Sequence, residues 1–153
     1  MATSTSTLNP SRLSGLARRL VQASLITADA AGRAQEDAAT NRQSLVLHLY
    51  EQKLIGNREL ARMVAEEFGA PLIDLTALDL RNMPLREVDE KLLRKHQVLP
   101  VLLRGNRLFV AMGDPTNQQA LDDIRFATRK QVEALVTEHP QLVEMLEKGL
   151  DAY

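Results

Sequence analysis

The first apolar residues of the chain recur with the spacing of one helix face. The pattern predicts a helix that ends near Ser24, with these residues turned inward: Leu13, Leu16, Leu20 and Val21. Thr27 then suits the N-cap of a second helix over residues 28–42, since its hydroxyl can accept a backbone N–H bond. That second helix carries a thin stripe of alanines, which lets a neighbouring helix approach closely. The start of the chain therefore predicts a helical hairpin.

The same pattern returns 29 residues further along the chain. Four pairs of residues at this offset are identical: Leu16/Leu45, Leu20/Leu49, Leu25/Leu54 and Ile26/Ile55. The second unit begins near Ser44, with Asn57 expected as the N-cap of its second helix and Gly69 as the residue that ends it. Since a single hairpin cannot bury its apolar side alone, the sequence predicts two hairpins packed together.

The pattern changes after Gly69. Pro71 and two short apolar runs predict an extended crossover, and Pro84 breaks the chain again. Further along, two apolar runs flank Arg-Gly-Asn-Arg, which is typical of a β-hairpin. The predicted elements are a helix over 87–96, strands over 98–103 and 108–112, a helix over 117–129, a strand over 132–136 and a helix with Pro140 in its first turn.

These patterns predict an α+β fold. Tandem helical hairpins come first, followed by a small α/β sandwich with a short three-stranded sheet. The expected divisions are a disordered tail, a tandem helical-hairpin subdomain, a crossover or hinge, and an α/β sandwich subdomain: residues 1–11, 12–70, 71–86 and 87–153.

Composition narrows the classes of function. The net charge of −1 and an aromatic content of 3% without Trp argue against nucleic-acid binding, because such binding needs a positive field or aromatic rings that stack on bases. There is no Cys, no P-loop and no G-x-G-x-x-G, and the three His match no metal spacing. No apolar run reaches the 18 residues of a membrane span. We therefore expect no catalytic residues, no metal site and no direct insertion into a membrane.

Two charged features are candidates for binding. Asp114 follows a predicted strand in Gly-Asp-Pro, where it suits a turn or a helix cap, and the alternative is a role at an interdomain or ligand surface. Four arginines near the start form either a solvated helix face or a surface for an anionic ligand or acidic partner: Arg12, Arg18, Arg19 and Arg33.

The stretches HQVLPVLLRGNRLFVAMGDP and ALDDIRFATR, supported by LSGLARRLVQASLI and SLVLHLYEQKLI, carry a resemblance to a known family. From Leu13 onward the chain resembles the N-terminal domain of type IV pilus assembly ATPases of the PilB type, which are relatives of the type II secretion ATPases. The resemblance implies a cytoplasmic domain, peripheral to the bacterial inner membrane, that precedes the motor of a hexameric protein and is not itself an ATPase. The partners it implies are inner-membrane platform proteins of the pilus machine and a PilZ-type regulator.

One branch of that family binds cyclic di-GMP through a tandem repeat with the consensus R-L-G-x-x-L-V-x-x-G-L-I-x-x-x-x-L-x-x-x-L-x-x-Q. In this sequence the two Arg positions fall on Gly15 and Ser44, and the two Gln positions fall on Ala38 and Glu67. The apolar frame therefore survives without the groups that read a guanine. The resemblance implies five candidate ligand-binding residues: Leu16, Leu45, Leu60, Val64 and Arg18. Asp114 joins them as a sixth candidate because of its place after the predicted strand.

The leading interpretation is a docking and regulatory domain without a cofactor. The alternative is a cyclic di-GMP sensor of the same family, in which the dinucleotide is the ligand.

Overall fold

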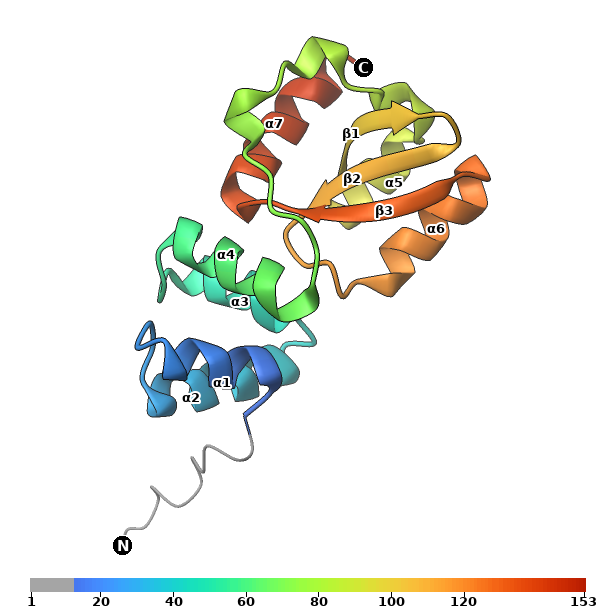
Figure 1. Cartoon of the computed structure of the whole chain (residues 1–153). Coiled ribbons are helices and arrows are strands. Elements are labelled where there is room, and N and C mark those ends of the chain that lie inside the picture. The colour runs from blue at the N-terminus through green and yellow to red at the C-terminus, as the bar shows by residue number, and fades with distance from the viewer. Residues whose placement is uncertain (1–12) are drawn as a thin grey trace, which may run out of the picture.

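The computed structural model describes residues 13–153. Its N-terminal half consists of two antiparallel helical hairpins stacked on one another, drawn in blue to green in Figure 1. Their four helices are α1 (Gly15–Gln22), α2 (Ala28–Thr40), α3 (Leu45–Gln52) and α4 (Asn57–Phe68). The tail expected over residues 1–11 lies outside the described residues.

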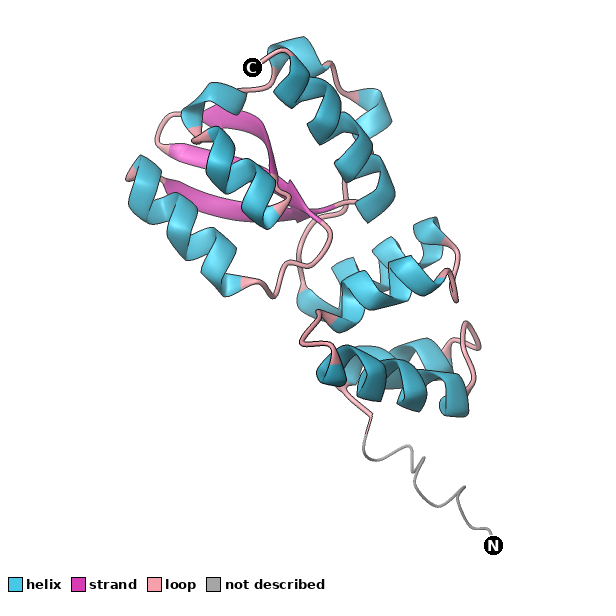
Figure 2. Ribbon diagram, turned by 180° about the vertical axis from the view of Figure 1, so that it is seen from behind, coloured by secondary structure: helices cyan, strands magenta, loops and turns pink. Residues whose placement is uncertain are grey.

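The second half is a three-stranded sheet covered by helices on both faces. Its strands lie in the order β1-β2-β3, with β1 antiparallel to β2 and β2 parallel to β3. Helices α5 and α6 cover one face, as Figure 2 shows from behind, and α7 packs on the other. The predicted α+β class is confirmed, and its elements are α5 (Glu90–His96), β1 (Leu99–Arg104), β2 (Arg107–Met112), α6 (Gln118–Thr128), β3 (Gln131–Val136) and α7 (His139–Asp151).

The helix boundaries follow the 29-residue offset of the sequence repeat. Helix α2 begins at Ala28 and α4 begins at Asn57, and the connector before each contains one residue in the left-handed region. Those two residues are Ser24, with φ of 60°, and Lys53, with φ of 54°. Both lie where the family consensus has glycine, the residue that adopts positive φ without steric cost. The connector geometry is therefore repeated although the glycine is absent from both copies.

The helix caps show one correction. Thr27 caps α2 as expected, since its hydroxyl accepts a bond from the N–H of Ala30 at 3.1 Å. Asn57, however, is the first residue of α4 and not its cap. The cap position belongs to Gly56, which has no side chain to accept a hydrogen bond. The Asn signal lies one residue too late because the repeat places the cap opposite Thr27.

The crossover after α4 is not extended as predicted. It winds through three single 3₁₀ turns, η3 (Leu75–Ala77), η4 (Leu80–Asn82) and η5 (Leu85–Glu87). Asp74 and Asp79 each accept a bond from the backbone N–H two residues ahead, which closes the first two turns. The Asp-x-x and Pro spacing of this segment therefore favours successive turns over a strand.

The two halves share a packed junction. The main core lies between the sheet and its helices, while a second cluster fills the hairpins around Leu49, Leu60 and Val64. Val136, at the end of β3, is buried within that hairpin cluster. Its N–H donates to the carbonyl of Pro71 at 2.7 Å, and its carbonyl accepts from Ile73 at 2.9 Å. The division into subdomains with a hinge at 71–86 stays a prediction.

Candidate functional site

The N-termini of α1 and α3 meet beside the loop after β2 and enclose a pocket of about 280 Å³. We call it the paired-cap pocket. Ser14 and Ser44 are the N-caps of the two helices, and their hydroxyls accept bonds from the N–H groups of Ala17 at 3.2 Å and Leu47 at 3.3 Å. The other side chains that line it and matter here are Leu16, Leu45, Glu67 and Asp114.

The fold makes this pocket a natural place for negative charge. The first turn of a helix has N–H groups without helical partners and carries a partial positive charge. Two such ends converge here because α1 and α3 occupy equivalent positions in the two hairpins. An anionic ligand would therefore find favourable electrostatics if no acid of the chain stood in its way.

Two carboxylates of the chain occupy that position. Asp114 accepts a hydrogen bond from the hydroxyl of Ser44 at 2.5 Å, which ties α3 to the α/β half. Its other oxygen accepts from the N–H and hydroxyl of Thr116, at 2.9 and 2.6 Å. The pocket thus already supplies its own anion on the α/β side.

Glu67 supplies the second carboxylate, from the end of α4. It accepts a bond from Arg19 Nε at 2.9 Å and lies directly over Gly15, where an added Cβ would collide with its oxygen. Gly15 and Glu67 are the positions of a consensus Arg and a consensus Gln from different repeats. The fold brings these two ligand-binding positions of the consensus together. In this sequence one of them carries an acid, Glu67, and the other, Gly15, has no side chain.

The structure separates the six candidate residues of the sequence analysis. Leu16, Leu45 and Asp114 all line the paired-cap pocket. Leu60 and Val64 are each 0% exposed in the hairpin core, so no ligand reaches them in this arrangement. Arg18 lies in a neighbouring groove between α1 and α4 and donates to the carbonyl of Leu13 at 3.0 Å. Arg12 lies outside the described residues.

The sequence analysis missed Ser44, Glu67 and Thr116 as pocket residues. Ser44 could have been found as a helix cap one residue before an apolar stripe. No local signal marks Glu67, because its place in the pocket depends on how α4 packs against α1.

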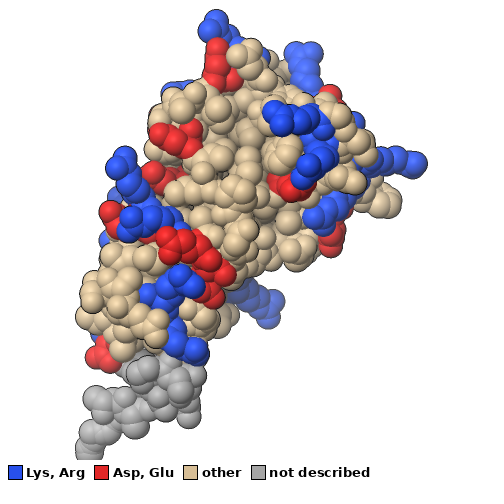
Figure 3. Space-filling model, in the orientation of Figure 1, with Lys and Arg blue, Asp and Glu red and all other residues tan. Residues whose placement is uncertain are grey.

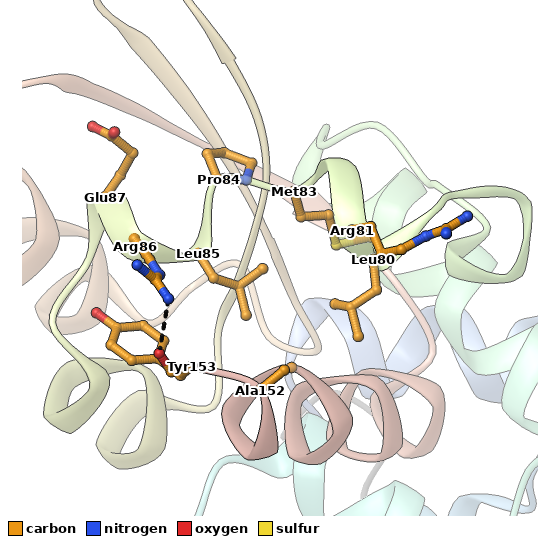
Figure 4. A pocket seen from close by; sticks show the side chains of 10 residues that line it. Leu80, Arg81, Met83, Pro84, Leu85, Arg86, Glu87, Ala152 and Tyr153 are labelled. Carbon is orange, nitrogen blue, oxygen red and sulfur yellow. Dashed lines mark hydrogen bonds between the residues drawn. The ribbon is translucent and has the colours of Figure 1, made fainter.

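A larger cavity, of about 390 Å³, lies between the 3₁₀ turns of the crossover and the end of α7. Figure 4 shows Leu80 and Leu85 pointing toward α7, and Arg86 donating to the carbonyl of Tyr153 at 3.3 Å. Gly149 makes room there, since a Cβ at that position would lie 2.6 Å from Leu85 Cδ2. None of the six candidate residues lines this cavity.

Two titratable rings, the buried Tyr50 and the half-buried His139, lie at the junction of the halves. Tyr50 of α3 and His139 of α7 face each other with ring centroids 6.0 Å apart. Burial, reinforced by the charge of Glu138, raises the pKa of Tyr50 above its ordinary value. Burial lowers the pKa of His139, against a smaller opposing effect of Glu51. Both rings are therefore held neutral, as packing requires.

Residues 13–153 contain neither a candidate metal site nor a candidate membrane-spanning helix. Within 13–153, no group of three or more His, Cys, Asp or Glu could hold a metal ion. In the same range no helix combines the length and apolar character of a membrane span.

The structure defines an α+β domain in which two stacked helical hairpins precede a helix-covered three-stranded sheet. Sequence comparison identifies its family. Residues 68–150, more than half of the chain, match the MshEN domain model, and the chain belongs to that family. It is 43% identical over 137 residues to the type IV pilus assembly ATPase PilB of Pseudomonas aeruginosa, and 36% identical to that of Acinetobacter baylyi. Each match covers 90% of this chain and 24% of the relative.

The chain therefore spans about a quarter of the length of these curated relatives and corresponds to their N-terminal domain, which is not the catalytic part. The resemblance to PilB-type ATPases is confirmed.

Solved structures show the same fold. The N-terminal domain of XpsE matches with a TM-score of 0.73 and 23% identity, covering 88% of this chain and 92% of that one. The structure of MshE with cdg, cyclic di-GMP, matches with a TM-score of 0.67 and 21% identity, covering 87% and 96%. At these identities the likeness defines the fold.

Proposed function

We propose that this chain is a non-catalytic docking and regulatory domain of a type IV pilus assembly ATPase. It binds proteins of the pilus machine in the cytoplasm, at the inner membrane, and couples their binding to the motor of a hexamer. The partners with the right setting are an inner-membrane platform protein and a PilZ-type regulator. Coupling then requires only that a partner stabilise one arrangement of the domain over another.

The observation that carries this proposal is the self-filled paired-cap pocket. Asp114 and Glu67 already pair with Ser44 and Arg19 where an anionic ligand would sit. Binding a dinucleotide there would bring its phosphates against two carboxylates, and like charges at close range are unfavourable. A domain that keeps the fold of the family without an open ligand site retains its outer surfaces for protein contact.

The test is a titration of the chain with the cytoplasmic part of the platform protein and, separately, with the PilZ-type regulator. We expect saturable binding to at least one of them by calorimetry, with cyclic di-GMP absent. Loss of all binding to both partners would contradict the proposal.

A second candidate function is cyclic di-GMP binding, and two observations favour it. The pocket is lined by Leu16 and Leu45, the equivalent leucines of the two repeats, and it lies at two helix N-termini. The similar fold of MshE is known with cdg. In this reading, Asp114 and Glu67 would turn away and Arg18 or Arg19 would meet the phosphates.

Calorimetry with cyclic di-GMP distinguishes the two candidates. A dissociation constant of about 1 µM, roughly −8 kcal/mol, would establish the sensor function. A Leu45→Asp variant serves as the negative control, because it places a further carboxylate in the lining of the pocket. A flat titration of the unmodified chain would exclude the sensor.

A further inference from the structure

One end of the α/β half, farthest from the helical hairpins, combines exposed cations with an exposed aromatic ring. We call it the distal end, and it consists of the half-buried Lys130 and of five exposed residues: Arg104, Arg107, Arg125, Phe126 and Arg129. In Figure 1 it is the side where the β1–β2 turn, the end of α6 and the start of β3 lie together. In Figure 3 Lys and Arg side chains gather on this side of the molecule.

Backbone geometry brings these residues together from separate elements. The turn between β1 and β2 uses Gly105 at a positive φ of 61°, and Asn106 in the turn accepts a bond from the N–H of Gln131 at 2.9 Å. The same register places Arg107 opposite both Arg104 and Gln131. Arg125, in the last turn of α6, reaches the carbonyl of Val132 at 3.1 Å.

Phe126 has the most exposed large apolar side chain among residues 13–153. It is 89% exposed, whereas every other such side chain in that range is at most 45% exposed. It occupies the outer face of α6 between Arg125 and Arg129. A phenylalanine in that position contributes nothing to the core, and its ring is available to an apolar environment outside the chain.

The distal end has more cationic side chains than carboxylates to pair with them. Three nearby carboxylates are already engaged, Glu133 by Arg107, Asp122 by Arg125 and Glu87 by Lys130. Arg104 and Arg129 form no ion pair within the described part of the chain. Arg104 also stands directly opposite Arg107 across the strand pair, an arrangement of like charges that lowers stability.

We propose that the distal end binds an anionic lipid surface. Guanidinium groups bind phosphate oxygens well, and a neighbouring aromatic ring lies at the level of the lipid headgroups, as in peripheral membrane proteins. The local positive charge, in a chain whose net charge is −1, complements such a surface. Adsorption of this kind needs no membrane-spanning helix. The inference rests on the proposed location of the domain at the inner membrane.

Other occupants fit the charges less well. A second copy of the chain would bring the same cations against each other, which disfavours self-association through this end. The remaining alternative is an acidic protein surface. In that case the distal end would bind a protein and would not bind lipid vesicles.

The experiment is co-sedimentation of the 153-residue chain with phosphatidylcholine vesicles, with and without phosphatidylglycerol, in the absence of any pilus protein. We expect binding only to vesicles that contain phosphatidylglycerol, weakened by added salt. Phe126→Ser and the double variant Arg104→Glu/Arg129→Glu should each lower the vesicle affinity by about tenfold or more. Leu54→Ser, at an exposed apolar residue of the hairpin half, is the matched control and should bind like the unmodified chain.

The outcomes separate clearly. No binding of the unmodified chain to phosphatidylglycerol vesicles would overturn the inference. Binding that survives both distal-end variants would also overturn it, since another face would then be responsible. Circular dichroism of each variant shows that the fold is intact. The proposed protein docking is tested without lipid, so either proposal can fail alone.

Discussion

The two halves of the molecule use their sequence in different ways. In the hairpins, the buried leucines of the repeat remain in place, while the polar reading positions of the family carry Gly, Ala, Ser and Glu. In the α/β half, residues 68–150 match the family model directly, and the core around the sheet is built of large aliphatic side chains. The comparison teaches that packing of the buried leucines is enough to form the two hairpins, whatever side chains stand at the polar positions of the consensus.

The largest expected effects on stability come from truncating a buried leucine in each of the two cores. Leu60 in the hairpins and Leu93 in the α/β half are both 0% exposed, so Leu60→Ala and Leu93→Ala should each lower the free energy of unfolding by about 2–5 kcal/mol. Because Val136 of β3 is buried in the hairpin core, we expect one cooperative transition in both variants. Urea denaturation monitored by circular dichroism measures the loss. If hydrogen exchange of Leu60→Ala shows loosened hairpins beside a fully protected sheet, the halves are independent.

The next effect concerns the lost reading positions. Gly15→Arg with Glu67→Gln restores two consensus side chains that lie next to each other in the paired-cap pocket. The new guanidinium donates to phosphate or base, and the amide replaces an acid that repels the ligand. We expect cyclic di-GMP affinity to rise by about 10–100-fold, or roughly 1.4–2.8 kcal/mol, by calorimetry.

The matched control for that variant is Arg33→Gln, which changes a cation away from the pocket and should leave the titration unchanged. An unimproved affinity in the double variant would mean that features beyond these two positions block the ligand.

A third variant tests the tie between the halves. Ser44 caps α3 and also donates to Asp114, whereas Ser14 caps α1 and its hydroxyl makes no such bond among the hydrogen bonds of the described residues. Ser14→Ala should cost about 1 kcal/mol of unfolding free energy and Ser44→Ala about 2 kcal/mol, since the second also leaves one oxygen of Asp114 without its donor. Equal losses in thermal denaturation would show that the Asp114 bond adds nothing to stability.

The sequence predicted the elements better than their connections. Leu16 and Leu45 identified both first helices, and Arg-Gly-Asn-Arg identified the β-hairpin, because those signals are local. The prediction of an extended crossover was wrong, because Asp side chains close turns there that the apolar pattern does not reveal. In the paired-cap pocket, Leu16 and Leu45 could be inferred from the family repeat, and Asp114 from its place in Gly-Asp-Pro after a strand. Glu67 could not, because its position over Gly15 depends on tertiary packing.

A smaller effect tests the repeated connectors. Lys53 has φ of 54°, a conformation that costs a residue with a Cβ more than it costs glycine. Lys53→Gly should therefore raise the free energy of unfolding by about 0.5–1 kcal/mol, and Ser24→Gly should do the same in the first copy. Gln52→Gly, within helix α3, is the control and should lower it. A loss in both connector variants would show that the side chains of Ser24 and Lys53 stabilise their turns by contacts that outweigh the backbone strain.

The smallest effect lies at the junction where the two cores meet, and it depends on pH. Burial lowers the pKa of His139 below 6.5, so the unfolded chain takes up a proton at a pH where the folded chain does not. Stability should therefore fall as pH drops through about 6.5 and stop falling from this cause once pH is below the folded pKa. His139→Asn should remove that part of the pH dependence in urea denaturation curves, because its side chain does not titrate. An unchanged slope in this variant would show that the imidazole of His139 does not contribute to the pH dependence of stability.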